Sequence, residues 1–500
     1  MSKRPILTAL LLTALAASSA PAQLLGGRGS GPLGGLGNVT GAVGGAVGGT
    51  MGRVGGAVGG PVGGSLGQAG GGLGGTLGGV GGQVDGTLSR VSNSLSSTSS
   101  GLADASGFGR SGLVHMVSSD ALNDLTPVDG YLTLGPEQLA DLRQLRHQAL
   151  IQANRKALDR DEKGEPVRKG ELIACDPDPA SLAAAQRAGF RVIGYEPVNL
   201  LGVRIVKLAP PPSMNVRQGL AALRRAAPNL QADYNHVYEP AGGALLPATG
   251  ASLAVTAAVR PGTRIAMIDG GVAAHPSLAA AGIEQRGFAG DPQPTGHGTA
   301  IGSLLVGSQG PFRGAARGAQ LFVGDVYGGN PAAGSATAIV QALAWAASKR
   351  PSVINISLIG PPNRTMERAI AAVRARGISV VAAVGNDGPA APPQYPASYP
   401  GVIAVTGGDA ADRALREAGR SAHLDFAAPG ADLVAALPGR GYTPVRGTSF
   451  AAPFVAARLA ATGSTAQLAA EATPGKGKVG RGVICGTCRI LPKMVGLNLK

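Results

Sequence analysis

From Arg264 onward, short apolar runs rich in β-branched residues alternate with alanine-rich segments of helical length. The apolar runs predict strands at residues 264–268, 320–326, 352–358, 378–384 and 402–405. The alanine-rich segments predict helices at residues 298–305, 335–348, 364–376 and 448–461. Such alternation is typical of a doubly wound, mostly parallel α/β sheet with helices on both faces. Ligands of these sheets bind beyond the carboxyl ends of the strands, so we expect the chemistry at that edge.

Residues 166–240 carry a different pattern and are predicted to form a small separate domain. Strands are expected at residues 171–175, 191–195, 200–208 and 231–238, and helices at residues 180–188 and 216–226. This β-α-β-β-α-β order is that of a ferredoxin-like α+β fold. A link rich in Gly, Ala and Pro at residues 240–251 separates it from the larger sheet.

A helix is also predicted ahead of this domain, from Gly135-Pro136 to about Asp161, within a helical connector at residues 131–165. Its face is mostly charged, so we expect it to lie on the surface or to connect units.

The N-terminal residues predict export. Lys3 and Arg4 precede a short apolar stretch at residues 6–17, and Ala20-Pro21-Ala22 matches a cleavage signal of small residues. The apolar stretch is too short to span a bilayer, so we interpret residues 1–22 as a signal peptide. The mature chain is then secreted, periplasmic or part of the cell envelope.

Composition changes the picture for residues 23–130, which are rich in Gly and Ser. Nearly half of residues 26–86 are glycine, with almost no charge and no aromatic residue, so burial cannot offset the entropy of ordering them. We predict a disordered low-complexity spacer. The alternative is a membrane-associating element with small residues every fourth position, but each interior Gly costs a helix about 1 kcal/mol relative to Ala.

The formal net charge of +15 is spread along the chain apart from a basic tail at residues 486–500, and aromatic residues make up only 3%. A nucleic-acid binder usually gathers its basic residues on one face, so nucleic acid is not expected as a partner. Among the three cysteines, Cys485 and Cys488 form a Cys-Gly-Thr-Cys segment. A local disulfide is favoured for this pair, ahead of half a metal site and ahead of redox catalysis.

Three short segments fit the expected edge of the larger sheet. Asp269 ends a predicted strand, while His297 and Ser449 stand at predicted helix starts, and each has a glycine close by. A serine hydroxyl is a poor nucleophile unless an imidazole takes its proton and a carboxylate orients that imidazole. Each residue alone reads as a cap or a turn residue, but together they predict nucleophilic catalysis.

A fourth segment, Gly385-Asn386-Asp387-Gly388, places an amide side chain directly after a predicted buried strand. Acyl transfer passes through a tetrahedral oxyanion, and a donor aimed at it lowers the barrier by about 3 to 4 kcal/mol. Asn386 is the candidate donor, with the backbone N–H of Ser449 as the second.

At these residues the sequence resembles the subtilisin-like serine peptidases, the subtilase family. The resemblance spans about residues 250–485 and includes Gly-His-Gly-Thr (296–299) and Gly-Thr-Ser-x-Ala-x-Pro (447–453). Residues 395–400 and 426–430 also resemble that family. The resemblance implies a subtilisin-like sheet, Ser449 as nucleophile, His297 as general acid and base, Asp269 as its orienting group and Asn386 as oxyanion donor.

The resemblance also implies a pocket for the substrate residue before the scissile bond. Its expected lining is Ser357, Leu358, Gly360, Gly385 and Gln394. None of these carries a charge, so we expect apolar or medium-sized uncharged side chains there.

The chain departs from the family pattern at two points. Gly270 stands where the family usually has Ser or Thr, and Ser357-Leu358-Ile359-Gly360 has one extra residue before its glycine. The sequence also has no dense Asp cluster, so we expect no cofactor and no obligatory metal. Calcium stays an alternative that the sequence does not indicate.

Subtilase family members commonly carry a propeptide of the kind that residues 166–240 resemble, which assists folding and then blocks the active site. We therefore predict an exported serine endopeptidase that acts on proteins or peptides, is inhibited by its own propeptide and cuts itself between about Tyr238 and Arg260. Two alternatives remain: a permanent accessory domain in place of the propeptide, and a non-catalytic cell-envelope scaffold that keeps the fold.

Overall fold

The structure is a computed structural model and describes residues 135–241, 259–439 and 441–497. The predicted signal peptide at residues 1–22 and the Gly/Ser-rich region at residues 23–130 lie outside the described residues. So does most of the predicted link at residues 240–251.

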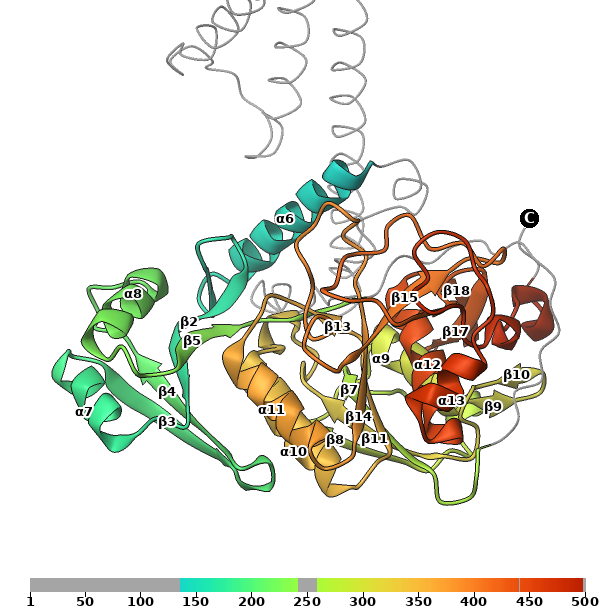
Figure 1. Cartoon of the computed structure of the whole chain (residues 1–500), viewed down its shortest axis with the longest axis horizontal. Coiled ribbons are helices and arrows are strands. Elements are labelled where there is room, and N and C mark those ends of the chain that lie inside the picture. The colour runs from blue at the N-terminus through green and yellow to red at the C-terminus, as the bar shows by residue number, and fades with distance from the viewer. Residues whose placement is uncertain (1–134, 242–258, 440, 498–500) are drawn as a thin grey trace, which may run out of the picture. The chain divides into compact units, whose positions relative to one another are not determined.

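The larger domain is built on a seven-stranded sheet in which every neighbouring pair is parallel (Figure 1). The strand order is β16-β15-β14-β12-β7-β11-β8. The bounds are β7 Arg264–Asp269, β8 Ile283–Gly287, β11 Gln320–Asp325, β12 Val353–Ile356, β14 Ser379–Ala383, β15 Ile403–Gly408 and β16 Phe426–Pro429. The chain adds β8 and β11 on one side of β7 and β12 on the other, so the strand order reverses at the β7–β12 junction. That junction is where a doubly wound sheet opens a crevice.

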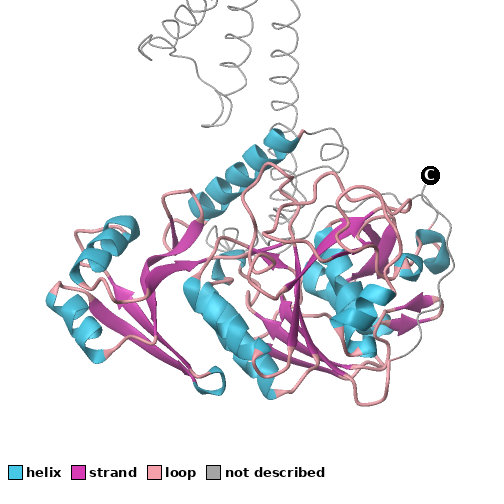
Figure 2. Ribbon diagram, viewed as in Figure 1, coloured by secondary structure: helices cyan, strands magenta, loops and turns pink. Residues whose placement is uncertain are grey.

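Helices bury both faces of this sheet, and successive side chains along each strand point to opposite faces. Ile265 and Met267 of β7 belong to one hydrophobic core, while Ala266 and Ile268 belong to the other. Helices α9 (Gly296–Val306) and α12 (Thr448–Thr462) supply the first core. Helices α10 (Ala336–Ser348) and α11 (Arg364–Arg374) supply the second (Figures 1 and 2). The predicted mostly parallel α/β fold is confirmed.

Sequence patterning missed two strands of this sheet. Strand β8 lies at the edge of the sheet, and its central residues Glu284, Gln285 and Arg286 are exposed and polar. It therefore lacks the apolar run by which the other strands were predicted. Strand β16 reads Phe-Ala-Ala-Pro, and it occupies the opposite edge, where a proline is tolerated. Smaller elements outside the sheet are β9 Ser308–Gln309, β10 Phe312–Arg313, β13 Leu358–Ile359, β17 Leu433–Leu437, β18 Gly441–Val445 and α13 Thr465–Ala470.

The smaller domain has the predicted ferredoxin-like order of elements. It comprises β2 Pro166–Cys175, α7 Pro179–Arg187, β3 Arg191–Val198, β4 Val203–Ala209, α8 Val216–Ala226 and β5 Ala232–His236. Its antiparallel strands run in the order β5-β2-β4-β3. Leu172, Val206 and Leu208 of the sheet pack against Leu220 and Leu223 of α8 in a separate core.

Helix α6 (Pro136–Ala153) differs from the sequence prediction in length and in burial. It ends at Ala153 rather than near Asp161, because residues Leu158–Arg160 form strand β1 and pair with β2. The charged face was expected at the surface, but Arg143 and His147 are each only 5% exposed. Carboxylates from other segments contact both side chains.

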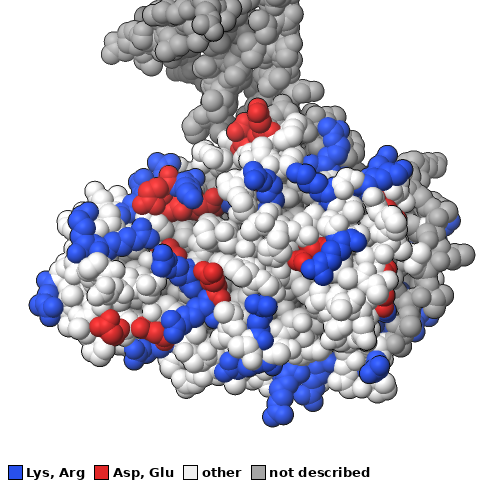
Figure 3. Space-filling view, in the orientation of Figure 1, with Lys and Arg blue, Asp and Glu red and all other residues white. Residues whose placement is uncertain are grey.

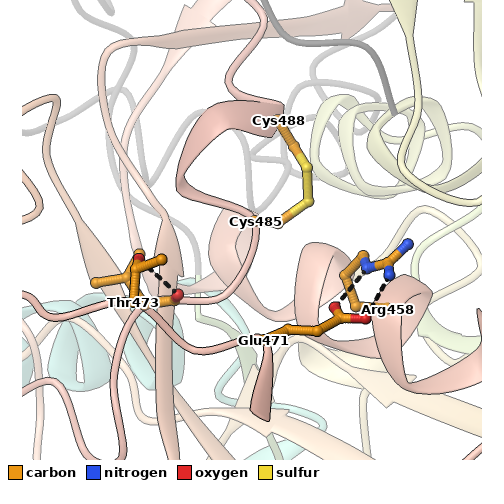
Figure 4. The surroundings of a disulfide bond; sticks show 6 residues. Arg458, Glu471, Thr473, Cys485 and Cys488 are labelled. Carbon is orange, nitrogen blue, oxygen red and sulfur yellow. Dashed lines mark hydrogen bonds and ion pairs between the residues drawn. A yellow bond between two sulfur atoms is a disulfide. The ribbon is translucent and has the colours of Figure 1, made fainter. Parts of the chain in front are cut away.

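The C-terminal residues pack on the larger domain. Cys485 and Cys488 form a disulfide (Figure 4), and both contact the core between the sheet and α12. Within the predicted basic tail, the carbonyl of Ile490 accepts a hydrogen bond from Val434 N (2.8 Å). The third cysteine, Cys175, is buried, and burial together with Asp176 raises the pKa of its thiol to about 11, so it is a poor nucleophile.

Candidate active site

Asp269 and His297 form a buried hydrogen-bonded pair at the carboxyl end of the sheet. Asp269 is the last residue of β7 and is 1% exposed, and His297 is the second residue of α9. Asp269 Oδ1 lies 2.8 Å from His297 Nδ1 and also accepts a hydrogen bond from Gly270 N at 2.8 Å. A proton held on Nδ1 by this carboxylate leaves Nε2 able to accept another.

Glycines allow α9 to approach the loop after β7 closely enough for this contact. A Cβ on Gly298 would lie 2.3 Å from the carbonyl oxygen of Gly270, so a larger residue would push the helix away. A Cβ on Gly270 would lie 2.4 Å from Oγ1 of Thr295, the residue that caps α9 by accepting from Gly298 N. Gly270 stands where the family usually has Ser or Thr because Thr295 fills the space that a side chain at position 270 would need.

Ser449 is the second residue of α12 and is fully buried. Its hydroxyl donates to the carbonyl oxygen of Ser357 (3.3 Å), and the Ser357 hydroxyl donates in return to the carbonyl of Ser449 (3.1 Å). The ring of Phe450, the next residue, lies 5.7 Å from the His297 ring between centroids. The start of α12 therefore joins the end of β12 and faces the Asp269–His297 pair.

Asn386 is held at the same edge by the start of α12. Its Oδ1 accepts a hydrogen bond from Thr448 N (2.9 Å), and the Thr448 hydroxyl accepts one from Gly385 N (3.0 Å). These bonds fix the amide plane, and the remaining Nδ2 group donates to the carbonyl oxygen of Ala241. The four residues predicted to be catalytic thus lie at one edge of the sheet, and the amide of Asn386 donates to a peptide carbonyl.

That carbonyl belongs to the segment that leaves the smaller domain. Strand β6 (Glu239–Pro240) pairs antiparallel with β13, placing Pro240 opposite Leu358 and Glu239 opposite Ile359. Ala241 N donates to the Ser357 carbonyl at 2.8 Å, so the pairing continues to the last residue before the undescribed link. We call residues 237–241 the tail segment. It lies along the site in extended conformation, with Ala241 next to Asn386.

Tyr238 of the tail segment is fully buried against the larger domain. Its hydroxyl donates to the Pro361 carbonyl (2.7 Å), and its own carbonyl accepts from the hydroxyl of Tyr327 (2.9 Å). A Cβ on Gly360 would lie 2.5 Å from the Tyr238 ring, so the glycine predicted to line the substrate site leaves room for this ring. Burial raises the pKa of Tyr238 well above its ordinary value, so its hydroxyl stays a donor.

The other predicted pocket residues also reach this edge. Leu358 pairs with Pro240, while Gly385 lies close to Ile359 and Gln394. Gln394 is 1% exposed, and its Nε2 donates to the Pro392 carbonyl (2.8 Å). Ser357, Leu358 and Gly360 thus contact the tail segment directly, while Gly385 and Gln394 lie behind Ile359 at the same edge.

Sequence reasoning missed a cluster of charges that covers the tail segment. Helix α6 contributes Arg143 and Arg146, which contact Asp387 at 3.1 Å and 2.5 Å respectively. Arg143 also forms two hydrogen bonds with Glu165, at 2.7 and 2.6 Å. The available signal was the spacing of these arginines, three residues apart on one helix face, together with an acidic residue directly after Asn386.

Glu239 of the tail segment belongs to the same charge cluster. His147 of α6 contacts its carboxylate directly, and Arg146 lies 3.9 Å from it. Burial alone would raise the pKa of Glu239, but His147, Arg146 and Arg143 lower it to about 2. The carboxylate therefore stays ionised down to strongly acidic pH and keeps the tail segment attached to α6.

Within the described ranges, no three His, Cys, Asp or Glu side chains gather closely enough to hold a metal ion, and no helix is long and apolar enough to cross a membrane. The absence of a cofactor stays a prediction. Basic and acidic side chains are interspersed on the face shown in Figure 3, which gives no support to a nucleic-acid site there.

Comparison with known proteins identifies the fold and the family. The sequence model of the subtilase family matches residues 260–474. Subtilisin Savinase from Lederbergia lenta is 34% identical over 209 residues, a match that covers 40% of this chain and 75% of that protein. An alkaline protease from Alkalihalobacillus alcalophilus is also 34% identical over 209 residues, but the match covers only 53% of its length.

Among solved structures, fervidolysin from Fervidobacterium pennivorans, a keratinolytic enzyme related to subtilisin, has a similar fold. Its TM-score is 0.56 at 19% identity, with 69% of this chain and 64% of that one covered. The parallel sheet and the sequence matches agree. The chain belongs to the subtilase family, the subtilisin-like serine peptidases.

Proposed function

We propose that this protein is an exported serine endopeptidase that is made as a self-processing zymogen. Ser449 Oγ attacks the carbonyl carbon of the scissile peptide bond, while His297 Nε2 takes the hydroxyl proton and Asp269 stabilises the imidazolium that forms. His297 then gives that proton to the leaving amine as the C–N bond breaks. Water then attacks the carbonyl carbon of the acyl-enzyme while His297 takes one of its protons. His297 returns that proton to Ser449 Oγ as the carboxylic acid product is released.

The hydrogen bond between Asn386 Nδ2 and the Ala241 carbonyl carries the proposal. In the tetrahedral intermediate this oxygen becomes negatively charged, and a donor already fixed by Thr448 needs no reorganisation to stabilise it. The backbone N–H of Ser449, at the start of α12, is the second proposed donor. The tail segment supplies the carbonyl in the position that a substrate would take.

The same contacts support self-processing at one bond. Ala241 is seated as the residue before the scissile bond, so the proposed cut lies between Ala241 and Gly242, within the range predicted from the sequence. Tyr238, Pro240 and Ala241 would then remain in the cleft as a product, and the α6 charge cluster would hold the tail segment there. The propeptide-like domain would thereby inhibit the new enzyme until it is degraded.

Export is proposed from the sequence features of residues 1–22, and proteins or peptides are the proposed substrates. The rival function is a non-catalytic scaffold that retains the fold. The two differ in whether Ser449 is activated, because an unactivated serine reacts poorly with phosphonate esters.

Covalent labelling distinguishes these two functions. We expect a fluorophosphonate probe to label the processed chain on the peptide that contains Ser449, and prior heating to prevent labelling. A folded chain that remains unlabelled under conditions that label a control serine peptidase would support the scaffold.

A further inference from the structure

Ile359 occupies a position on the substrate-binding strand from which it faces the residue before the scissile bond. Residues directly opposite in an antiparallel pair point to the same face, and Ile359 is opposite Glu239. Ala241 is two residues beyond Glu239 in extended chain, so its side chain points to that face as well. Ile359 and Ala241 therefore share one face of the β6–β13 pair.

The side chain of Ile359 extends from that face towards Gly385, the predicted opposite wall of the pocket. A Cβ built on Gly385 would lie 3.2 Å from Ile359 Cγ2, 3.3 Å from Ile359 Cδ1 and 3.4 Å from Gln394 Cγ. The space over Gly385 is thus already filled by Ile359 from one side and Gln394 from the other. Ile359 is 5% exposed and Ala241 is 1% exposed, and both belong to one buried cluster.

We infer that Ile359 limits the pocket to small side chains, so that alanine is preferred before the scissile bond and aromatic residues are excluded. The inference rests on the proposed peptidase function. It narrows the side chains expected before the scissile bond from apolar or medium-sized uncharged ones to small ones. The physical reason is steric. A large side chain would have to displace a β-branched residue that is fixed by strand pairing on one side and by packing on the other.

The test compares kcat/KM of the self-processed enzyme for two peptide anilides, Tyr-Glu-Pro-Ala and Tyr-Glu-Pro-Phe. The first copies residues 238–241 of the tail segment. We expect wild type to favour the Ala peptide by about 10- to 100-fold in kcat/KM. Ile359→Ala should raise kcat/KM for the Phe peptide by about 10-fold or more and change that for the Ala peptide by less than about threefold. Ile359→Val, which lacks only Cδ1, should fall between the two.

Ile354→Ala is the matched control, since it truncates a buried isoleucine of β12 that faces the opposite core. It should lower stability without altering the Phe-to-Ala ratio. If Ile359→Ala does not fold, the inference is tested by comparing the Phe-to-Ala ratio of kcat/KM between Ile359→Val and wild type. A wild-type preference for Phe, or a ratio that neither Ile359 variant changes, would overturn the inference. A wild-type chain that cuts neither peptide would instead contradict the proposed function.

Discussion

Replacement of Ser449 by alanine should abolish peptide hydrolysis and leave the precursor uncut. The Ser449 hydroxyl, at the second position of α12, is the proposed nucleophile, and the buried helix should accept alanine because it is smaller than serine and favours a helix. Loss of the nucleophile in such triads lowers kcat by about a millionfold, leaving the contributions of binding and the oxyanion donors. Steady-state hydrolysis and gel analysis of the precursor measure both effects.

Ser348→Ala provides a control for this variant, because Ser348 is an exposed serine at the end of α10. It should process itself and hydrolyse peptides at the wild-type rate. Residual activity of Ser449→Ala above a few per cent of wild type would show that another residue is the nucleophile.

Replacement of Asn386 by leucine should lower kcat by about 100- to 1,000-fold with little change in KM. Leucine has a similar volume but offers no donor at the position where the Ala241 carbonyl oxygen now lies. The loss falls on kcat because the bond strengthens as negative charge develops on that oxygen. Steady-state kinetics on one peptide, with chains matured by added wild-type enzyme, separates kcat from KM.

Asn386 also accepts a hydrogen bond from Thr448 N, so a second variant is needed that keeps this acceptor. Asn386→Asp keeps an oxygen acceptor for Thr448 N, removes the amide donor and adds a negative charge that opposes an oxyanion. It should lose activity at least as strongly as Asn386→Leu while the start of α12 stays in place. A loss of less than tenfold in both variants would remove Asn386 from the oxyanion site.

The larger sheet was predictable wherever burial on both faces leaves a continuous apolar run. Strands β7, β11 and β14 show this, and β12 does so apart from the buried Asn355. Strand β8 does not, because its edge position exposes Glu284 and Arg286. The location of the proposed catalytic residues at one edge of the sheet was predictable because each follows a predicted strand or begins a predicted helix beside a glycine.

Contacts between segments far apart in the chain were not predictable. The burial of Arg143 and His147 depends on Glu165, Glu239 and Asp387, which come from three other segments. The pairing of Glu239 with Ile359 likewise depends on how two domains meet, which no local pattern encodes. Gly270 looked like a departure from the family, and only Thr295, distant in sequence, explains it.

The sequence of the N-terminus of the self-processed chain tests the central claim most directly. The precursor would be incubated until processing is complete and its larger fragment sequenced, with Ser449→Ala treated in parallel. We predict a mature N-terminus at Gly242 for wild type and no cut in the variant. A mature chain that retains residues 166–240, or the same cut appearing in Ser449→Ala without added enzyme, would contradict the account.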